Sequence, residues 1–136
     1  MTIKLTTTNF IHMKSLDPEI VPVSIALINP KHLNMLSYRK LAPTKYTLEM
    51  FHKTRKEDEY IQRYFHQTLN KLNFKEVLKE LVELTGSTNI ALVCYESKSK
   101  FCHRHIVIRW ILYHLGIDIV NTKFIPDDTY TIELED

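Results

Sequence analysis

The chain has 136 residues, of which 44% are hydrophobic, 10% aromatic and 25% charged. This size and balance predict one globular domain spanning residues 1–136 and exclude a disordered chain. No apolar run approaches the roughly 20 residues of a membrane helix, and residues 1–10 lack the features of a signal peptide, so we expect a cytoplasmic protein without membrane contact.

The charges are unevenly distributed along the chain. All 18 Lys and Arg precede Pro126, whereas five of the 16 acidic residues follow it. A moderately basic body favours an anionic partner such as a nucleotide or nucleic acid, and an ordinary mixed surface with an acidic tail is the alternative. The sequence does not predict the oligomeric state.

The first half of the chain predicts two strands, a loop and a helix. Residues 2–7 alternate polar and apolar, and residues 22–28 are nearly continuously apolar, as in a buried strand. Residues 31–43 have no clean period, so we expect a long loop. Thr44 is a candidate N-cap for a helix over about residues 45–55.

The second half predicts further helices alternating with strands. We expect helices over about 57–72, 74–85 and 102–115, and strands over 89–94, 117–120 and 129–134. The third of the four helices has Asn73 as its cap and Gly86 at its end. A strand, a helix and a strand in succession from residue 89 indicate a βαβ unit. The predicted fold class is α/β, a small Rossmann-like three-layer domain whose mainly parallel sheet is flanked by helices.

Chemically active side chains gather between the strand over 89–94 and the following helix. In α/β sheets, ligands bind beyond the carboxyl ends of the strands, so we expect these side chains to converge: Cys94, Glu96, Cys102, His103 and Arg104. A helix N-terminus with nearby cations attracts anions and lowers the pKa of a cysteine.

Three functional interpretations of this loop compete. In the first, an enzyme uses Glu96, Cys102 and His103 as catalytic residues and binds an anionic substrate through Arg104 and other basic side chains, Lys100, Lys31 and Arg39. In the second, Cys94, Cys102 and His103 bind zinc, although the usual C-x₂₋₄-C spacing is absent, so no cofactor is favoured. In the third, the thiols form a redox pair without the C-x-x-C signature.

Two alternatives from other classes stay open. One is a non-catalytic module that binds nucleic acid or protein through basic side chains, Lys31, Arg39, Lys40, Lys98, Lys100, Arg104 and Arg109. The other is a purely structural loop with a buried cysteine, a Glu96–Arg104 ion pair and a solvated His103.

The run ALVCYESKSKFCHRHIVIRWI, residues 91–111, resembles the signature of the domain of unknown function 488 family, in which a strand ending in Cys is followed by Glu and a Cys-His-Arg triplet. Leu41-Ala42-Pro43 and Tyr60-Ile61-Gln62-Arg63-Tyr64 also resemble that family, and the similarity covers about residues 24–115. The resemblance implies a Rossmann-like α/β domain of bacteria or their phages. By fold-level analogy it implies a nucleotide-related ligand.

The chain departs from the family at the end of the second predicted strand. Many members carry an acidic residue or an arginine there, followed by a basic-Pro loop, whereas residues 24–32 read SIALINPKH. If that side chain belongs to the family's site, the resemblance implies that Lys31 or Arg39 replaces it or that the activity differs.

Overall fold

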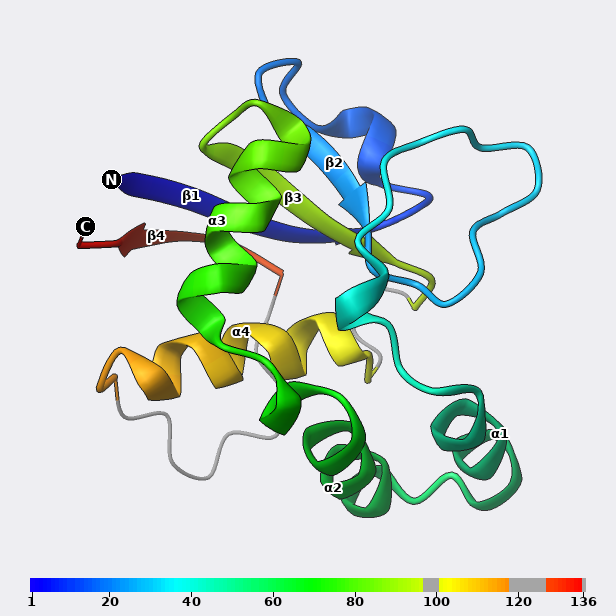
Figure 1. Ribbon diagram of the computed structural model, residues 1–136. Helices are drawn as coiled ribbons and strands as arrows, with labels where there is room; N and C mark the ends of the chain where they lie inside the picture. Colours follow the sequence, from blue (N-terminus) through cyan, green and yellow to red (C-terminus); the bar gives the residue numbers. More distant parts are fainter. Residues whose placement is uncertain (97–100, 118–126, 136) are drawn as a thin grey trace.

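The computed structural model describes residues 1–96, 101–117 and 127–135 (Figure 1). Within these residues one four-stranded sheet has the order β2-β3-β1-β4. The central strand β3 pairs in parallel with β1 and β2, whereas β4 pairs antiparallel with β1. The α/β class is confirmed, with a mixed sheet. The strands are β1 (Thr2–Asn9), β2 (Val21–Ser24), β3 (Asn89–Cys94) and β4 (Thr129–Glu133).

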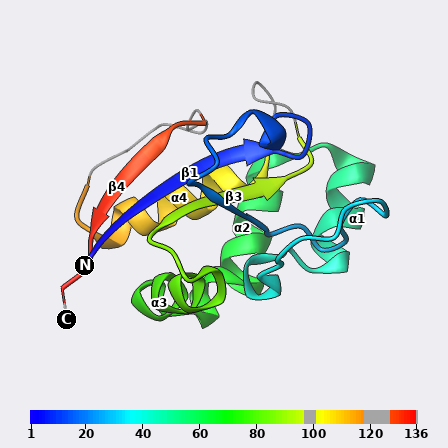
Figure 2. The ribbon, with the colours of Figure 1, turned by 90° about the horizontal axis from the view of Figure 1, so that it is seen from above.

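Four α-helices accompany this sheet in the described part of the chain. Seen from above in Figure 2, α4 passes behind β1 and β3, and Figure 1 shows it below them, so α4 lies on one face of the sheet. The helices are α1 (Lys45–Thr54), α2 (Glu57–Gln67), α3 (Phe74–Thr85) and α4 (His103–His114). None of the helices in residues 1–96, 101–117 and 127–135 is long and apolar enough to span a bilayer.

Local capping signals set the helix boundaries, as predicted. Thr44 Oγ1 accepts a hydrogen bond from the Thr47 amide at 3.1 Å, and Asn73 Oδ1 accepts from the amides that follow it. Gly86 ends α3 with a φ of 67°, in the left-handed region that glycine adopts without strain. Each cap satisfies backbone groups that the helix itself leaves unpaired.

The second strand is shorter than predicted, because the chain leaves the sheet after Ser24. The Ser24 hydroxyl accepts from the Ala26 amide at 3.2 Å, and Asn29 Nδ2 donates to the Ser37 hydroxyl at 2.8 Å, which closes residues 25–37 into a loop. Ile28 is 69% exposed, so the prediction of a buried strand up to residue 28 was wrong. Side-chain hydrogen bonds replaced the strand ladder that the apolar run predicted.

Two other boundaries bear on the predicted topology. The helix predicted over 57–72 ends at Gln67, and a 3₁₀ turn occupies Leu69–Lys71. The predicted strand over 117–120 falls mostly on residues 118–120, which lie outside the described residues. The parallel strands β2 and β3 are connected by the segment that contains α1, α2 and α3. The expected edge strand is present as β4.

The core lies between the sheet and α4. Ile3, Leu5, Ile90 and Leu92 are fully buried on the strands, and nine of the twelve residues of α4 are buried. A helix that is apolar nearly all round must pack on more than one side, and α4 packs against both β3 and α2. This packing fixes the N-terminal turn of α4 beside the carboxyl end of β3.

Candidate active site

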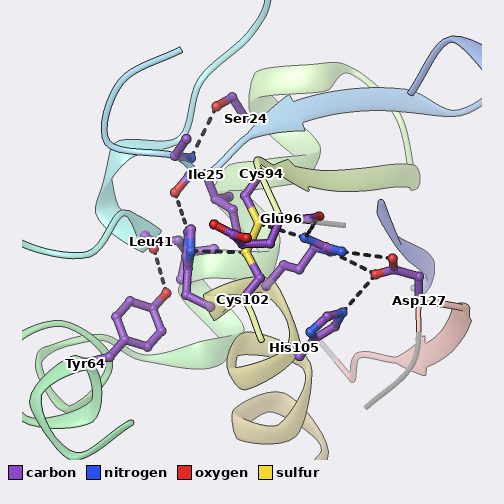
Figure 3. The surroundings of a disulfide bond; sticks show 12 residues. Ser24, Ile25, Leu41, Tyr64, Cys94, Glu96, Cys102, His105 and Asp127 are labelled. Atoms are coloured by element: carbon purple, nitrogen blue, oxygen red, sulfur yellow. Dashed lines mark hydrogen bonds and ion pairs between the residues drawn. A yellow bond between two sulfur atoms is a disulfide. The ribbon is translucent and has the colours of Figure 1, made fainter. Parts of the chain in front are cut away.

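The site is formed where β3 ends and α4 begins. Cys94 is the last residue of β3, Cys102 is the N-cap residue of α4, and a disulfide bond joins them. Figure 3 shows this pair with Glu96 at the centre, Tyr64 on one side, and His105 and Asp127 on the other. The predicted convergence is confirmed for Cys94, Cys102 and His103, each of which places a ligand atom within 4.8 Å of the others.

His103 is a buried, neutral imidazole with one nitrogen directed at sulfur. Its Nε2 lies 2.7 Å from the backbone carbonyl of Ile25, and since a carbonyl only accepts, Nε2 carries the proton. Nδ1 is then unprotonated and lies 3.7 Å from the Cys102 sulfur. Burial, aided by the neighbouring Arg104 and His105, lowers the pKa of His103 to about 4. This His103 is buried, not solvated.

Arg104 lies on the other side of the α4 terminus, in a closed polar cluster. Its side chain is fully buried, and its Nε and Nη2 donate to the two carboxylate oxygens of Asp127 at 2.8 and 3.0 Å. Nη1 donates to the Cys94 sulfur at 3.1 Å and to the backbone carbonyl of Glu96 at 2.9 Å. Arg104 therefore fastens the loop to β3 and balances the charge of Asp127.

Asp127 completes this cluster. Its Oδ1 also lies 3.0 Å from His105 Nε2. Burial alone would raise the pKa of this carboxyl group, but hydrogen bonds from His105 and Arg104 and the charge of Arg104 lower it well below its usual range. Asp127 is thus an anion at neutral pH and the partner of the fully buried arginine.

A cavity of about 390 Å³ opens on the opposite side, next to the disulfide. Aromatic rings form much of its wall. Phe51 and Phe101 lie 5.4 Å apart between ring centres, and Tyr60 lies 5.2 Å from Phe51 and 5.1 Å from Phe101. Behind them, Tyr64 packs edge-on against His103 at 5.6 Å. Beside Phe51, Tyr60 and Phe101, the lining comprises Ala26, Leu27, Ile28, Pro43, Leu48, His52, Cys94, Tyr95, Glu96, Cys102 and His103.

Two polar side chains in the cavity wall are available to a ligand. Glu96 is exposed, and its charge contributes, after burial, to the raised pKa of Tyr60. Tyr60 is 3% exposed, and no hydrogen bond of its hydroxyl is seen among the described residues. The cavity thus offers a carboxylate and a phenol hydroxyl between apolar and aromatic surfaces.

Among the described residues, the predicted basic side chains do not line this cavity. Lys31 is exposed on the loop after β2, Arg39 donates to the Leu27 carbonyl at 2.8 Å, and Lys40 pairs with Glu80 at 2.8 Å. Arg109 is half-buried on α4. Lys98 and Lys100 lie outside the described residues.

Sequence reasoning missed two parts of the site. Asp127 was assigned only to an acidic tail, because its contact with Arg104 spans 23 residues and leaves no local pattern. The aromatic wall formed by Phe51, Tyr60 and Phe101 was not predicted, because these residues come from three separate segments. The neighbouring Leu41-Ala42-Pro43 segment was a usable signal, since Pro43 lines the cavity.

Together these features define a small α/β protein with a cysteine-lined aromatic cavity at the carboxyl edge of its sheet. The family model described as the active DUF488-N3 subclade matches residues 17–115. The chain therefore belongs to the domain of unknown function 488 family. Neither the curated proteins nor the solved structures contain a match.

Proposed function

We propose that this protein is an enzyme acting on a nucleotide or a related nucleic-acid component, with Glu96 as its general acid/base or nucleophile. The observation that carries the proposal is the single cavity that brings Glu96, Cys102 and His103 together with an aromatic wall. Concave sites of 300–1,000 Å³ with few polar groups are typical of small-molecule sites. The description of the matched subclade as active favours an enzyme over a binding module.

The lining of the cavity supports a planar, heterocyclic ligand. Base–aromatic stacking is worth roughly 1–3 kcal/mol per base, and Phe51, Phe101 and Tyr60 present ring surfaces there. The Tyr60 hydroxyl would donate a hydrogen bond to an acceptor on the base. Glu96, at the exposed side, would face the bond that reacts.

The remaining site residues receive distinct roles. His103 and, once the disulfide is reduced, Cys102 would act as catalytic residues beside Glu96, with His103 Nδ1 as a neutral acceptor. Arg104 is paired with Asp127, so its charge is less available to a substrate anion. The binding of a substrate anion by Arg104, Lys31, Arg39 and Lys100 stays a prediction. In this proposal Arg104 chiefly positions the segment that carries Glu96, through its hydrogen bond to the Glu96 carbonyl.

The decisive variant is Glu96→Gln, which keeps the shape of the side chain and removes its charge. A panel of nucleosides, nucleotides and free bases would be screened by thermal shift and then for turnover by mass spectrometry. We expect Glu96→Gln to lower turnover by about 10²–10⁴-fold, the usual contribution of a general acid or base. Glu83→Gln, on the exposed side of α3, is the matched control and should behave as wild type.

The same experiment separates the enzyme from a binding module. A module that binds through phosphate contacts should tolerate Glu96→Gln, show no turnover, and lose affinity steeply as salt is raised. Binding of this kind without turnover in either variant would contradict the enzyme proposal.

A zinc site is a second candidate, favoured by the closeness of its three potential ligands once the disulfide is reduced. Cys94, Cys102 and His103 form a Cys₂His set that leaves a fourth position for water. The Nε2–H of His103 donates to a backbone carbonyl, which is typical of metal-binding histidines. Protein kept reduced with a phosphine and dialysed against zinc should bind one equivalent, and Cys102→Ser should lose it.

We further propose that the domain is a Rossmann-like, three-layer variant. The parallel β2-β3-β1 arrangement supports this assignment, although β4 is antiparallel. An experimental structure that includes residues 118–126 would test whether a further parallel strand follows α4.

A further inference from the structure

We propose that the Cys94–Cys102 disulfide is a redox-active couple that exchanges with a low-molecular-weight thiol entering the cavity. The thiol attacks Cys102, and Cys94 is the leaving group. This activity goes beyond the proposed function, because it requires neither a nucleotide nor Glu96.

The first support is access. Both cysteines line the cavity, so a small thiolate reaches the bond without unfolding of the domain. Cys102 is 5% exposed and Cys94 is 1% exposed. Thiol–disulfide exchange requires that an attacking thiolate can reach one sulfur atom of the disulfide.

The second support is the asymmetry of the two sulfur atoms. Arg104 Nη1 donates to the Cys94 sulfur at 3.1 Å, so a thiolate formed at Cys94 gains a charge-assisted hydrogen bond. Asp127 contacts the Nε side of the Arg104 guanidinium and offsets its charge. The Nη1–H of Arg104 still points at the Cys94 sulfur. Exchange is faster when the leaving thiol is the better stabilised thiolate.

His103 distinguishes Cys102 in the opposite way. Its unprotonated Nδ1 lies 3.7 Å from the Cys102 sulfur, so in the reduced protein the Cys102 thiol can donate a hydrogen bond to it. The reduced couple is therefore expected to hold a thiolate at Cys94 and a thiol at Cys102.

The exchange is a balanced two-electron reaction. A thiolate from solution bonds to the Cys102 sulfur, the Cys94–Cys102 bond breaks, and its electron pair stays on Cys94 beside Arg104. A second thiolate then attacks the sulfur of the bound small thiol, which leaves as a disulfide with the attacker. Cys102 departs as a thiolate and takes a proton from water. Two small thiolates are oxidised to one small disulfide, and the protein disulfide is reduced to a thiolate at Cys94 and a thiol at Cys102.

The native protein with its disulfide intact gives the direct test. It is exposed briefly to reduced glutathione, quenched in acid, and mapped by peptide mass spectrometry. We expect the glutathionyl adduct on Cys102 over Cys94 by about tenfold, since both access and leaving-group stability favour that direction. Equal adducts, an excess on Cys94, or resistance to glutathione until the protein is denatured would each overturn the proposal.

Two single-cysteine variants form a matched pair. Cys94→Ser keeps the Cys102 sulfur beside His103, and Cys102→Ser keeps the Cys94 sulfur beside Arg104. With oxidised glutathione the attacking group is the protein thiolate, so we expect Cys102→Ser, which keeps the Cys94 thiolate beside Arg104, to form a mixed disulfide about tenfold faster. An equal or slower rate would overturn the proposal. Circular dichroism confirms that both are folded, and if one is not, the adduct position on the wild-type protein decides. Failure of nucleotide binding would leave this outcome unchanged, which keeps the two proposals separable.

Discussion

The first turn of α4 separates two regions that differ in burial and charge. On one side, Arg104, His105 and Asp127 form a buried cluster whose charges are balanced. On the other, Glu96 and Tyr60 line an aromatic cavity, with His103 neutral beside the disulfide. Figure 3 shows the disulfide between Tyr64 on one side and His105 and Asp127 on the other.

The charged residue that stands out in a sequence motif need not be the one that binds the ligand. Arginine in the Cys-His-Arg triplet is the natural anion anchor by sequence, yet its guanidinium is fully buried against a carboxylate. The exposed acid and the hydroxyl across the cavity are chemically more available. The closed region holds the fold in place, and the open region is suited to chemistry.

The largest expected effect comes from breaking the closed region with Asp127→Asn. This change removes the carboxylate charge that pairs with the fully buried Arg104, and breaking a buried ion pair typically costs roughly 3–5 kcal/mol. Because the backbone of Asp127 is partly exposed, water relieves some of this cost and we expect about 3 kcal/mol, measured by urea unfolding. Asp128→Asn, its exposed neighbour, is the control. Equal stability of the two variants would show that the Arg104–Asp127 ion pair does not stabilise the fold.

The next effect is a loss of stability in acid caused by His103. Its pKa is about 4 in the folded state and about 6.5 when unfolded. The unfolded chain therefore binds the proton first, and stability is lost as pH falls from about 6.5 through 4. The loss amounts to up to about 3 kcal/mol.

The variant His103→Gln isolates this contribution, because the glutamine amide can still donate to the Ile25 carbonyl but does not titrate. We expect its unfolding free energy to depend less on pH between 6.5 and 4 than that of wild type. His32→Gln, on the exposed loop, should retain the full dependence. An unchanged slope in His103→Gln would contradict the assignment of a neutral, buried imidazole. The lowered pKa of Asp127 acts in a separate window at still lower pH.

Two tyrosine hydroxyls differ in their surroundings, and removing each one should change stability by a different amount. Tyr64 is fully buried and its hydroxyl donates to the Leu41 carbonyl at 2.6 Å, so Tyr64→Phe should cost about 1–2 kcal/mol. Tyr60 lines the cavity and its hydroxyl makes no hydrogen bond among the described residues, so Tyr60→Phe should change stability by less than about 0.5 kcal/mol. Thermal unfolding measures both, and a larger loss in Tyr60→Phe would show that its hydroxyl is structural.

The smallest effect is expected at the surface ion pair between Lys40 and Glu80. Its atoms are 2.8 Å apart, as close as those of Arg104 and Asp127, but the side chains are 58% and 36% exposed. Exposed pairs contribute about 0–1 kcal/mol, so Lys40→Met should lower stability by less than about 1 kcal/mol and less so in high salt. A loss matching Asp127→Asn would mean that burial does not explain the difference.

Features fixed by neighbours in sequence were predictable. The caps at Thr44 and Asn73, the glycine end of α3, and the strand over 89–94 were all confirmed. The convergence of the cysteines and His103 was also predictable, because a strand end and the following helix start must lie together in an α/β sheet. The predicted strand over 22–28 is confirmed only up to Ser24, because hydrogen bonds of Ser24 and Asn29 hold residues 25–37 in a loop.

What the sequence determined by itself was the set of elements and the placement of Cys94, Glu96, Cys102 and His103 around one helix terminus. The tertiary structure alone decided which neighbour became buried and which faced a cavity. It did so by bringing Asp127 to Arg104 and aromatic rings from three segments to the disulfide. The physical reason is range: caps and periodicity act over a few residues, whereas charge balance and cavity shape depend on segments that meet only after folding.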